Sequence, residues 1–294
     1  MLIYNYVKGI ISLIIFGLNT LICTMLLYPF LFLKTISPAG RLKNLFNRWM
    51  VQIGETWISA NNINLDLTQN IQWNIKGLDG LSIDRSYLIL ANHQSWMDIV
   101  ILQYVLNHRV PFIRFFLKKE LIYVPLLGGA WWALDFPFMK RYSLKELRKN
   151  PLRRREDFET ARQAGLKFRE SPVSILSFLE GTRFTKTKHE VQKSPFKNLL
   201  VPKVGGLSAV IQGMGENFYR VLDISIVYPE GVVSLLQAFM GQLHRIQVNV
   251  RQLPVPVHLM SGDYFNDPSY RQSVQSWVRE VWTQKDQIIS EIKK

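Results

Sequence analysis

The distribution of apolar residues sets the amino-terminal segment apart from the rest of the chain. Residues 9–33 carry no charged side chain, and Asn19 is their most polar member. At 1.5 Å per residue, a helix of this length is long enough to cross a bilayer with some tilt. A cleaved signal peptide would have a shorter apolar core and small residues at a cleavage site, and the segment has neither. We therefore predict a membrane helix within residues 1–35, although Tyr28-Pro29 is also compatible with a hairpin or with a helix lying in the membrane plane.

Residues 40–60 show a second pattern, in which apolar side chains recur at helical spacing with basic side chains between them. This pattern is typical of an amphipathic helix, either in the membrane interface or packed on a domain. Because it follows a membrane segment, we assign residues 36–62 to an interfacial helix. Lys8 is the one charged residue before the apolar run, whereas a cluster of basic residues follows it. The positive-inside rule therefore places the remainder of the chain in the cytoplasm.

Short apolar runs alternate with helical patterns from residue 63 to residue 294, which predicts one α/β domain. The expected strands are Ile71–Lys76, Tyr87–Leu90, Val110–Phe116, Phe136–Met139, Val173–Phe178, Val221–Tyr228 and Arg245–Val250. The expected helices are Ser95–Asn107, Arg154–Glu170, Val204–Gly213 and Pro268–Ile292. Alternation of this kind is typical of a mixed, largely parallel sheet flanked by helices.

A histidine and a carboxylate stand where one of these strands gives way to a helix, in Asn92-His93-Gln94-Ser95-Trp96-Met97-Asp98. Histidine is the side chain best suited to moving a proton near neutral pH, and a carboxylate on its far ring nitrogen would fix its tautomer. Five residues along one helix are about 140° apart, so His93 must precede the helix if it is to meet Asp98 in the first turn. His93 would then be a general base oriented by Asp98. Ser95-x-x-Asp98 fits a capping box equally well, in which case Asp98 only caps the helix.

A second polar group, Glu180-Gly181-Thr182-Arg183, follows the strand expected at residues 173–178. Glycine lets a backbone approach a ligand closely, and arginine offers a fork of donors that matches a phosphate. We expect Glu180 to hold Arg183 in place. Taken alone, such a sequence is more often a surface turn with an ion pair. Both polar groups nevertheless fall at the carboxyl ends of buried strands, where open α/β sheets bind their ligands.

Together these motifs resemble the lysophospholipid acyltransferase family, the PlsC-like glycerolipid acyltransferases. N-H-x-x-x-x-D and F-x-E-G-T-R are similar to its first and third blocks. Its second block is similar to Lys118-Lys119-Glu120-Leu121, Pro125-Leu126-Leu127-Gly128 and Phe136-Pro137-Phe138-Met139-Lys140-Arg141. The run from Trp132 to Ser143 resembles the YihG-type branch of bacterial inner-membrane acyltransferases. The likeness extends from about Trp73 to the carboxyl terminus.

The fourth block departs from the V-P-x-x-P of many members. It is Leu199-Leu200-Val201-Pro202-Lys203-Val204-Gly205-Gly206, and a later strand ends in Tyr228-Pro229. This variant resembles the longer lysophospholipid acyltransferases, which leaves the reaction type unchanged and the exact acceptor open.

The resemblance implies an O-acyltransferase with a glycerolipid-acyltransferase-like domain in the bacterial inner membrane. The donor would be acyl-CoA or acyl carrier protein, the acceptor 1-acylglycerol 3-phosphate and the product phosphatidic acid, with no further cofactor and no metal. The catalytic pair would be His93 and Asp98, and the acceptor phosphate would be bound by Glu180, Gly181, Thr182, Arg183 and Arg141. Lysophosphatidylglycerol or lysocardiolipin is the alternative acceptor. A membrane-bound esterase and a noncatalytic lipid-binding protein are the alternative functions.

The net charge of +14, from 36 basic and 22 acidic residues, points to an anionic partner. A basic cluster at residues 140–155 would attract either nucleic acid or anionic lipid head groups. The membrane segment favours lipid, so we expect no nucleic acid partner, although residues 153–169 would also be compatible with a solvated helix. The sole cysteine, Cys23, excludes a disulfide framework and fits a reducing compartment.

Overall fold

The computed structural model describes residues 2–38, 40–140, 150 and 153–294. Its helices are α1 (Leu2–Ile36), α2 (Arg41–Thr68), α3 (Met97–Leu106), α4 (Leu127–Ala133), α6 (Arg153–Lys167), α7 (Lys186–Gln192), α8 (Gly205–Met214), α9 (Leu235–Gln237) and α10 (Pro268–Ile292). Its strands are β1 (Gln72–Lys76), β2 (Ser86–Ala91), β3 (Ile113–Phe115), β4 (Leu117–Lys118), β5 (Phe138–Met139), β6 (Ser174–Phe178), β7 (Phe218–Val227) and β8 (Arg245–Leu253).

A six-stranded sheet with the order β1-β8-β7-β2-β6-β3 forms the centre of the domain. Strands β3, β6, β2 and β7 are mutually parallel, and β8 is antiparallel to β7 but parallel to β1. The last residue of β2, Ala91, pairs with Phe178 of β6 on one side and with Ile224 of β7 on the other. The carboxyl ends of three central strands therefore meet at one edge. The expectation of a mixed, largely parallel sheet is confirmed.

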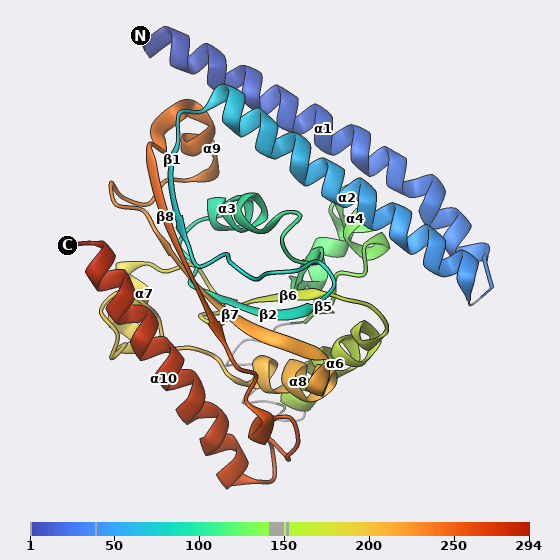
Figure 1. Ribbon diagram of the computed structural model, residues 1–294, viewed down its shortest axis with the longest axis vertical. Coiled ribbons are helices and arrows are strands. Elements are labelled where there is room, and N and C mark those ends of the chain that lie inside the picture. Colours follow the sequence, from blue (N-terminus) through green and yellow to red (C-terminus); the bar gives the residue numbers. More distant parts are fainter. Residues whose placement is uncertain (1, 39, 141–149, 151–152) are drawn as a thin grey trace.

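Helices cover both faces of this sheet (Figure 1). All six residues of β2 are buried, as expected for a central strand covered on both sides. Leu88 and Leu90 pack in a cluster with residues of α8 and α10, whereas Tyr87 and Ile89 pack in a second cluster with residues of α3. This division follows from the twofold repeat of a strand, which turns alternate side chains to opposite faces.

Helices α1 and α2 form an antiparallel pair along one side of the molecule (Figure 1). Polar side chains join them: Nδ2 of Asn64 donates to the carbonyl oxygen of Ser12 at 3.0 Å, and Nδ2 of Asn19 donates to Oδ1 of Asn61 at 2.8 Å. Ser12, Asn61 and Asn64 are buried. Because a buried polar group without a partner is costly, these bonds favour one register of the two helices.

The outer face of α1 is apolar and exposed. Residues 6–36 form the one helix in the described part of the chain that is long and apolar enough to cross a membrane, and 22% of its most apolar stretch is buried. Its exposed large side chains include Ile10, Ile11, Ile14, Leu18, Leu21, Ile22, Met25, Leu26 and Phe32. A continuous apolar surface of this kind marks a contact with another surface or with lipid.

Most element positions agree with the sequence predictions, and α10 has the expected bounds. The strand expected at Val110–Phe116 is shorter than expected, because only β3 (Ile113–Phe115) lies in this range and pairs with β6 in the main sheet. The short strand β4 follows it and pairs with β5 in a separate two-stranded sheet. Helix α2 continues past the boundary placed at residue 62 and ends at Thr68. Arg141 and three further basic residues of the cluster at residues 140–155, namely Lys145, Arg148 and Lys149, lie outside the described residues.

Candidate active site

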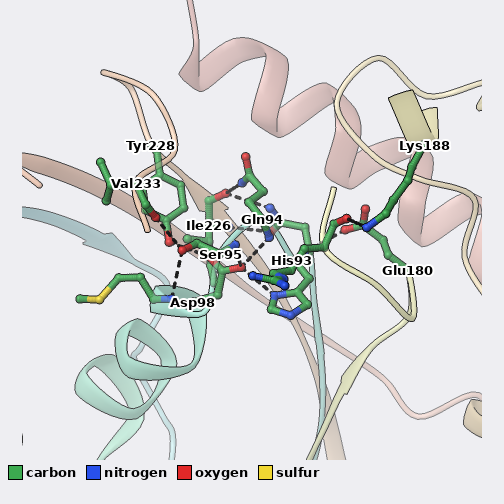
Figure 2. Close-up of polar contacts among 12 residues, drawn as sticks. His93, Gln94, Ser95, Asp98, Glu180, Lys188, Ile226, Tyr228 and Val233 are labelled. Atoms are coloured by element: carbon green, nitrogen blue, oxygen red, sulfur yellow. Dashed lines mark hydrogen bonds and ion pairs between the residues drawn. The ribbon is translucent and has the colours of Figure 1, made fainter. Parts of the chain in front are cut away.

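His93 and Asp98 meet at the carboxyl end of β2. The strand ends at Ala91 and α3 begins at Met97, so His93 lies in the connecting loop and Asp98 in the first turn of the helix. Nδ1 of His93 is 2.8 Å from Oδ2 of Asp98 (Figure 2). The Asp98 side chain is fully buried, and the His93 side chain is 14% exposed. No described residue forms a hydrogen bond with Nε2 of His93, so this nitrogen is available to a substrate.

Asp98 also organises the loop that carries His93. Its Oδ2 accepts hydrogen bonds from the backbone amides of Gln94 and Ser95. The bond from Ser95 is one half of a capping box, but the N-cap residue of α3 is Trp96, whose side chain forms no cap. The two interpretations left open by the sequence are therefore compatible, because one carboxylate contacts the histidine and stabilises the turn before the helix.

The second oxygen of Asp98 has a partner that the sequence analysis did not single out. The hydroxyl of Tyr228 donates to Oδ1 of Asp98 at 2.6 Å. Tyr228 directly follows β7 and is buried. Burial, reinforced by the negative charge of Asp98, raises the pKa of Tyr228 well above its usual range. The Tyr-Pro pair after a buried strand was the available signal, but only the topology brings β7 beside β2.

Asn92 fixes the start of the same loop. Its Nδ2 donates to the carbonyl oxygen of Ile226 at 2.9 Å, and its Oδ1 accepts from the Ile226 amide at 2.8 Å. The Asn92 side chain thereby hydrogen-bonds both the N–H and the C=O of Ile226. This residue belongs to the part of β7 that extends past its pairing with β2. The hydroxyl of Ser95 adds a 2.6 Å bond to the carbonyl oxygen of Val233. These contacts position the His93 loop against the end of β7 (Figure 2).

Glu180 holds the second motif against the first. Its Oε1 accepts from the His93 amide at 2.8 Å and its Oε2 from the Leu200 amide at 3.0 Å. The expected pairing of Glu180 with Arg183 is therefore wrong, since both carboxylate oxygens point inward to backbone donors. Glu180 is fully buried, and this desolvation raises its pKa to about 7 against the opposing effect of the two amides. Glu180 therefore has a structural role, since its carboxylate links the His93 loop to the segment at Leu200.

The remaining residues of the second motif face outward. Gly181 adopts a φ of 67°, a left-handed conformation that favours glycine, and the side chain of Lys203 crosses it so closely that a Cβ there would be 3.2 Å from Nζ. Nζ of Lys188 donates to Oγ1 of Thr182 at 2.8 Å and to the carbonyl oxygen of Arg183 at 2.9 Å. The guanidinium of Arg183 lies 5.3 Å from the centre of the Trp96 ring. Three cations, Arg183, Lys188 and Lys203, therefore lie at this turn, and the sequence analysis assigned neither lysine to the site.

Two further contacts shape the surroundings of the histidine. The ring of Phe178, at the end of β6, stacks on the His93 imidazole with centroids 4.0 Å apart and an interplanar angle of 17°. The Phe184 amide donates to the carbonyl oxygen of His93 at 2.7 Å. Residues on both sides of the second motif thus contact the histidine.

A buried lysine binds backbone carbonyl groups near the carboxyl ends of β2 and β7. Nζ of Lys285, on α10, donates to the carbonyl oxygens of Leu90 in β2 and Ile224 in β7, and lies 2.8 Å from Oδ1 of Asp223. Arg251 of β8 binds the other oxygen of Asp223 at 2.6 Å. Burial lowers the pKa of Lys285, and the charge of Asp223 opposes this effect. This ion-paired cation joins β2 and β7 directly before the site.

Other catalytic arrangements have less support in the described part of the chain. No group of three or more His, Cys, Asp or Glu side chains there is placed to hold a metal ion. An esterase would need a nucleophile such as a serine beside a base. Ser208 is buried, and its hydroxyl is 3.1 Å from the hydroxyl of Tyr270 instead of a histidine or carboxylate base.

Residues 72–229, more than half of the chain, match the family model described as Acyltransferase. The chain belongs to the Acyltransferase family. Among curated proteins it is 25% identical over 180 residues to the 1-acyl-sn-glycerol-3-phosphate acyltransferase gamma of Mus musculus, covering 58% of this chain and 43% of that protein. It is 27% identical over 216 residues to the 1-acyl-sn-glycerol-3-phosphate acyltransferase 3 of Arabidopsis thaliana, covering 68% and 51%. The chain thus spans about half or less of the length of these relatives.

Among solved structures, the chain is similar to the 1-acyl-sn-glycerophosphate (LPA) acyltransferase PlsC from Thermotoga maritima, with a TM-score of 0.55 and 16% sequence identity. The superposition covers 98% of both chains. The chain therefore has a PlsC-like fold that includes the amino-terminal helix pair as well as the sheet.

Proposed function

We propose that this acyltransferase transfers an acyl group from a thioester donor to the free hydroxyl of 1-acylglycerol 3-phosphate and so produces phosphatidic acid. The observation that carries the proposal is the contact between His93 and buried Asp98, which leaves Nε2 of the histidine open to a substrate. Family membership supports acyl transfer. The names of the relatives support this acceptor over lysophosphatidylglycerol or lysocardiolipin.

In the proposed reaction, Nε2 of His93 takes the proton of the acceptor hydroxyl while the hydroxyl oxygen attacks the thioester carbonyl carbon. Asp98 keeps the proton of His93 on Nδ1 and stabilises the imidazolium that forms. Collapse of the tetrahedral intermediate breaks the carbon–sulfur bond, and the departing thiolate takes the proton from Nε2. The products are a new ester and a free thiol, and the histidine returns to its starting state.

The outward residues of the second motif are proposed to bind the acceptor phosphate. Arg183 offers a planar fork of donors, and Lys203 adds positive charge beside Gly181. Glu180 contributes indirectly, by holding the turn against His93. This arrangement would place a phosphate and the base at opposite ends of a glycerol backbone. Acyl-CoA and acyl carrier protein stay alternative donors, with no cofactor beyond them.

The helix pair is proposed to hold the enzyme on the cytoplasmic face of a membrane. The exposed apolar face of α1 supports lipid contact. Helix α2 runs beside α1 and exposes Arg41, Lys43, Arg48 and Asp66. Charged side chains are costly in hydrocarbon, so a position along the interface is favoured over a vertical span of both helices. Anionic head groups would attract the basic protein.

A panel assay tests the proposal. The purified protein is given one labelled acyl-CoA and, in turn, lysophosphatidic acid, lysophosphatidylglycerol, lysocardiolipin and no acceptor. We expect labelled phosphatidic acid, and a loss of about 10²-fold or more in His93→Ala with folding preserved. Preferred acylation of another lysolipid would correct the acceptor. Release of free fatty acid without any acceptor would replace the proposal by an esterase, and full activity of folded His93→Ala would remove His93 as the base.

A further inference from the structure

Tyr228 occupies a position in the site that the proposed reaction does not use directly. Three donors converge on Oδ2 of Asp98, namely Nδ1 of His93 and the amides of Gln94 and Ser95. The hydroxyl of Tyr228 donates to the opposite oxygen, Oδ1, at 2.6 Å. Both Asp98 and Tyr228 are buried, so bulk water is a poor substitute for either partner.

We propose that Tyr228 is a positioning residue for the reaction, acting on His93 through Asp98. This inference rests on the proposed function only for its kinetic readout. By binding Oδ1, the hydroxyl fixes the rotation of the carboxylate about its Cβ–Cγ bond. Oδ2 then stays directed at Nδ1 of His93, and Nε2 stays directed toward the substrate.

The hydroxyl of Tyr228 is suited to this task because it remains a donor. Burial and the neighbouring charge of Asp98 both disfavour the phenolate, so the pKa of Tyr228 is raised well above its usual range. The proton therefore stays on Tyr228 at the pH values at which histidine acts as a base. The position of Tyr228 is set by β7 and by a turn in which the Gly231 amide donates to the Tyr228 carbonyl oxygen at 3.2 Å.

The hydrogen bond also has an electrostatic effect. A donor at Oδ1 stabilises the carboxylate and reduces the attraction that it exerts on a proton of His93. Without the hydroxyl, the protonated imidazole is held more strongly, and neutral His93 is obtained at higher pH. Among the described residues, Glu180 from the loop after β6 is a further charge near Asp98, and Lys285 from α10 interacts with Glu180 in turn. Neither forms a hydrogen bond with Asp98, so the variant below leaves their contacts in place.

The test compares Tyr228→Phe with Tyr270→Phe. Tyr270 is a matched control, because it is also buried and its hydroxyl donates to the carbonyl oxygen of Leu259 at 2.7 Å, away from His93. We expect kcat of Tyr228→Phe to fall by about 10- to 100-fold, the effect of one hydrogen bond to a charged group, with little change in KM. The acidic limb of its pH–rate profile should move to higher pH. Tyr270→Phe should keep the wild-type profile.

Two further measurements separate this inference from the proposed function. The NMR titration midpoint of the His93 imidazole should rise in Tyr228→Phe, whatever reaction the protein catalyses. In an Asp98→Asn background, Tyr228→Phe should cause no additional loss of kcat. An unchanged His93 midpoint, or losses that multiply, would overturn the role of Tyr228. A raised midpoint in a protein that does not acylate lysophosphatidic acid would leave the link from Tyr228 to His93 standing and reject the proposed function alone.

A second variant covers the case in which Tyr228→Phe fails to fold. Fluorotyrosine at position 228 keeps the shape of the side chain and makes its hydroxyl a stronger donor. The acidic limb and the His93 midpoint should then move to lower pH, opposite to the phenylalanine variant. A shift in the same direction as that of the phenylalanine variant, or no shift, would contradict the proposal.

Discussion

The backbone amide of His93 donates a hydrogen bond to Oε1 of Glu180 at 2.8 Å. Two motifs that are 87 residues apart are thereby joined at the level of the backbone. The amide of Phe184 returns a second bond to the carbonyl oxygen of His93 at 2.7 Å. Because both bonds involve main-chain atoms of the histidine, the proposed base and the proposed phosphate-binding turn keep a fixed separation.

Replacing Asp98 by asparagine should reduce both activity and stability. In the wild type, Nδ1 of His93 and the backbone amides of the loop all donate to Oδ2 of Asp98. The asparagine side chain has an NH2 donor in place of one carboxylate oxygen, so either the His93 contact or the bonds to the loop amides are lost. We expect a drop in kcat of about 10²-fold or more, together with about 1 to 3 kcal/mol of stability. Activity assays and urea unfolding measure the two effects.

Asp267→Ala is the control for this change, because Asp267 caps α10 by accepting from the amides of Ser269 and Tyr270, and alanine cannot accept these bonds. Loss of this cap should lower stability without lowering kcat at temperatures below unfolding. If Asp98→Asn behaved in the same way as Asp267→Ala, Asp98 would be a structural residue only.

Arg183 should determine the preference for a phosphorylated acceptor. A lysine point charge does not reproduce the bidentate geometry of a guanidinium, so Arg183→Lys should raise the acceptor KM and Arg183→Ala should raise it further. Donor KM should change little. The preference for lysophosphatidic acid over monoacylglycerol, which has no phosphate, should collapse in the alanine variant.

Arg220→Ala is a suitable control for Arg183→Ala, since Arg220 also stacks on an aromatic ring, that of Tyr219, at 5.2 Å. Its substitution should leave the acceptor preference intact. An unchanged preference in Arg183→Ala, with activity reduced overall, would assign Arg183 to the fold or to the donor.

Glu180 should make stability depend on pH. Its pKa is raised to about 7 in the folded protein, whereas an unfolded glutamate titrates near about 4.3. The folded state therefore binds the proton more tightly, and the stability due to Glu180 is fully present below about pH 4.3 and lost as the pH rises through about 7. Relative to Glu180→Gln, wild-type stability should decline by roughly 3 kcal/mol across this range. Unfolding curves at several pH values measure the difference, and a constant difference would show that burial does not control this carboxyl.

Removal of the buried cation on α10 should destabilise the domain. Lys285→Met leaves the carbonyl oxygens of Leu90 and Ile224 without their donor and Asp223 with Arg251 alone. Breaking one side of such a buried network typically costs about 3 to 5 kcal/mol. Lys293→Met, directly after the same helix and exposed, should have a much smaller effect. Equal denaturation midpoints for the two variants would mean that the Lys285 contacts contribute little.

Local patterns predicted the strands and helices well, because burial imposes a twofold or helical repeat that is visible in the sequence. Helix α10 is the clearest case: Asp267 caps it and Pro268 occupies its first turn, and both signals are local. The insertion of β8 between β1 and β7 was not predicted. Its position depends on pairing between residues about 170 apart, such as Trp73 with Ile246, and no local pattern reports such contacts.

The same distinction explains the site. His93 and Asp98 were predicted because a strand, a loop and a helix turn bring them together within six residues. Tyr228 and Lys285 were missed because they act only where the topology places them, beside β2. Glu180 was assigned to Arg183 by its spacing, but the backbone amides of His93 and Leu200 are buried donors and bind its carboxylate instead.

Lys285 follows Leu90, whose carbonyl oxygen it binds, by 195 residues. At a synthesis rate of about 5 to 20 residues per second, the ribosome completes β2 on the order of 10 to 40 s before it adds this lysine. Helix α1 leaves the ribosome earlier still and is free to engage lipid during that interval. The growing chain thus acquires its proposed anchor before the strand ends around His93 gain their buried cation. Targeting through the proposed anchor would then precede activity, and a chain released before α10 was made would have this anchor without a finished candidate active site.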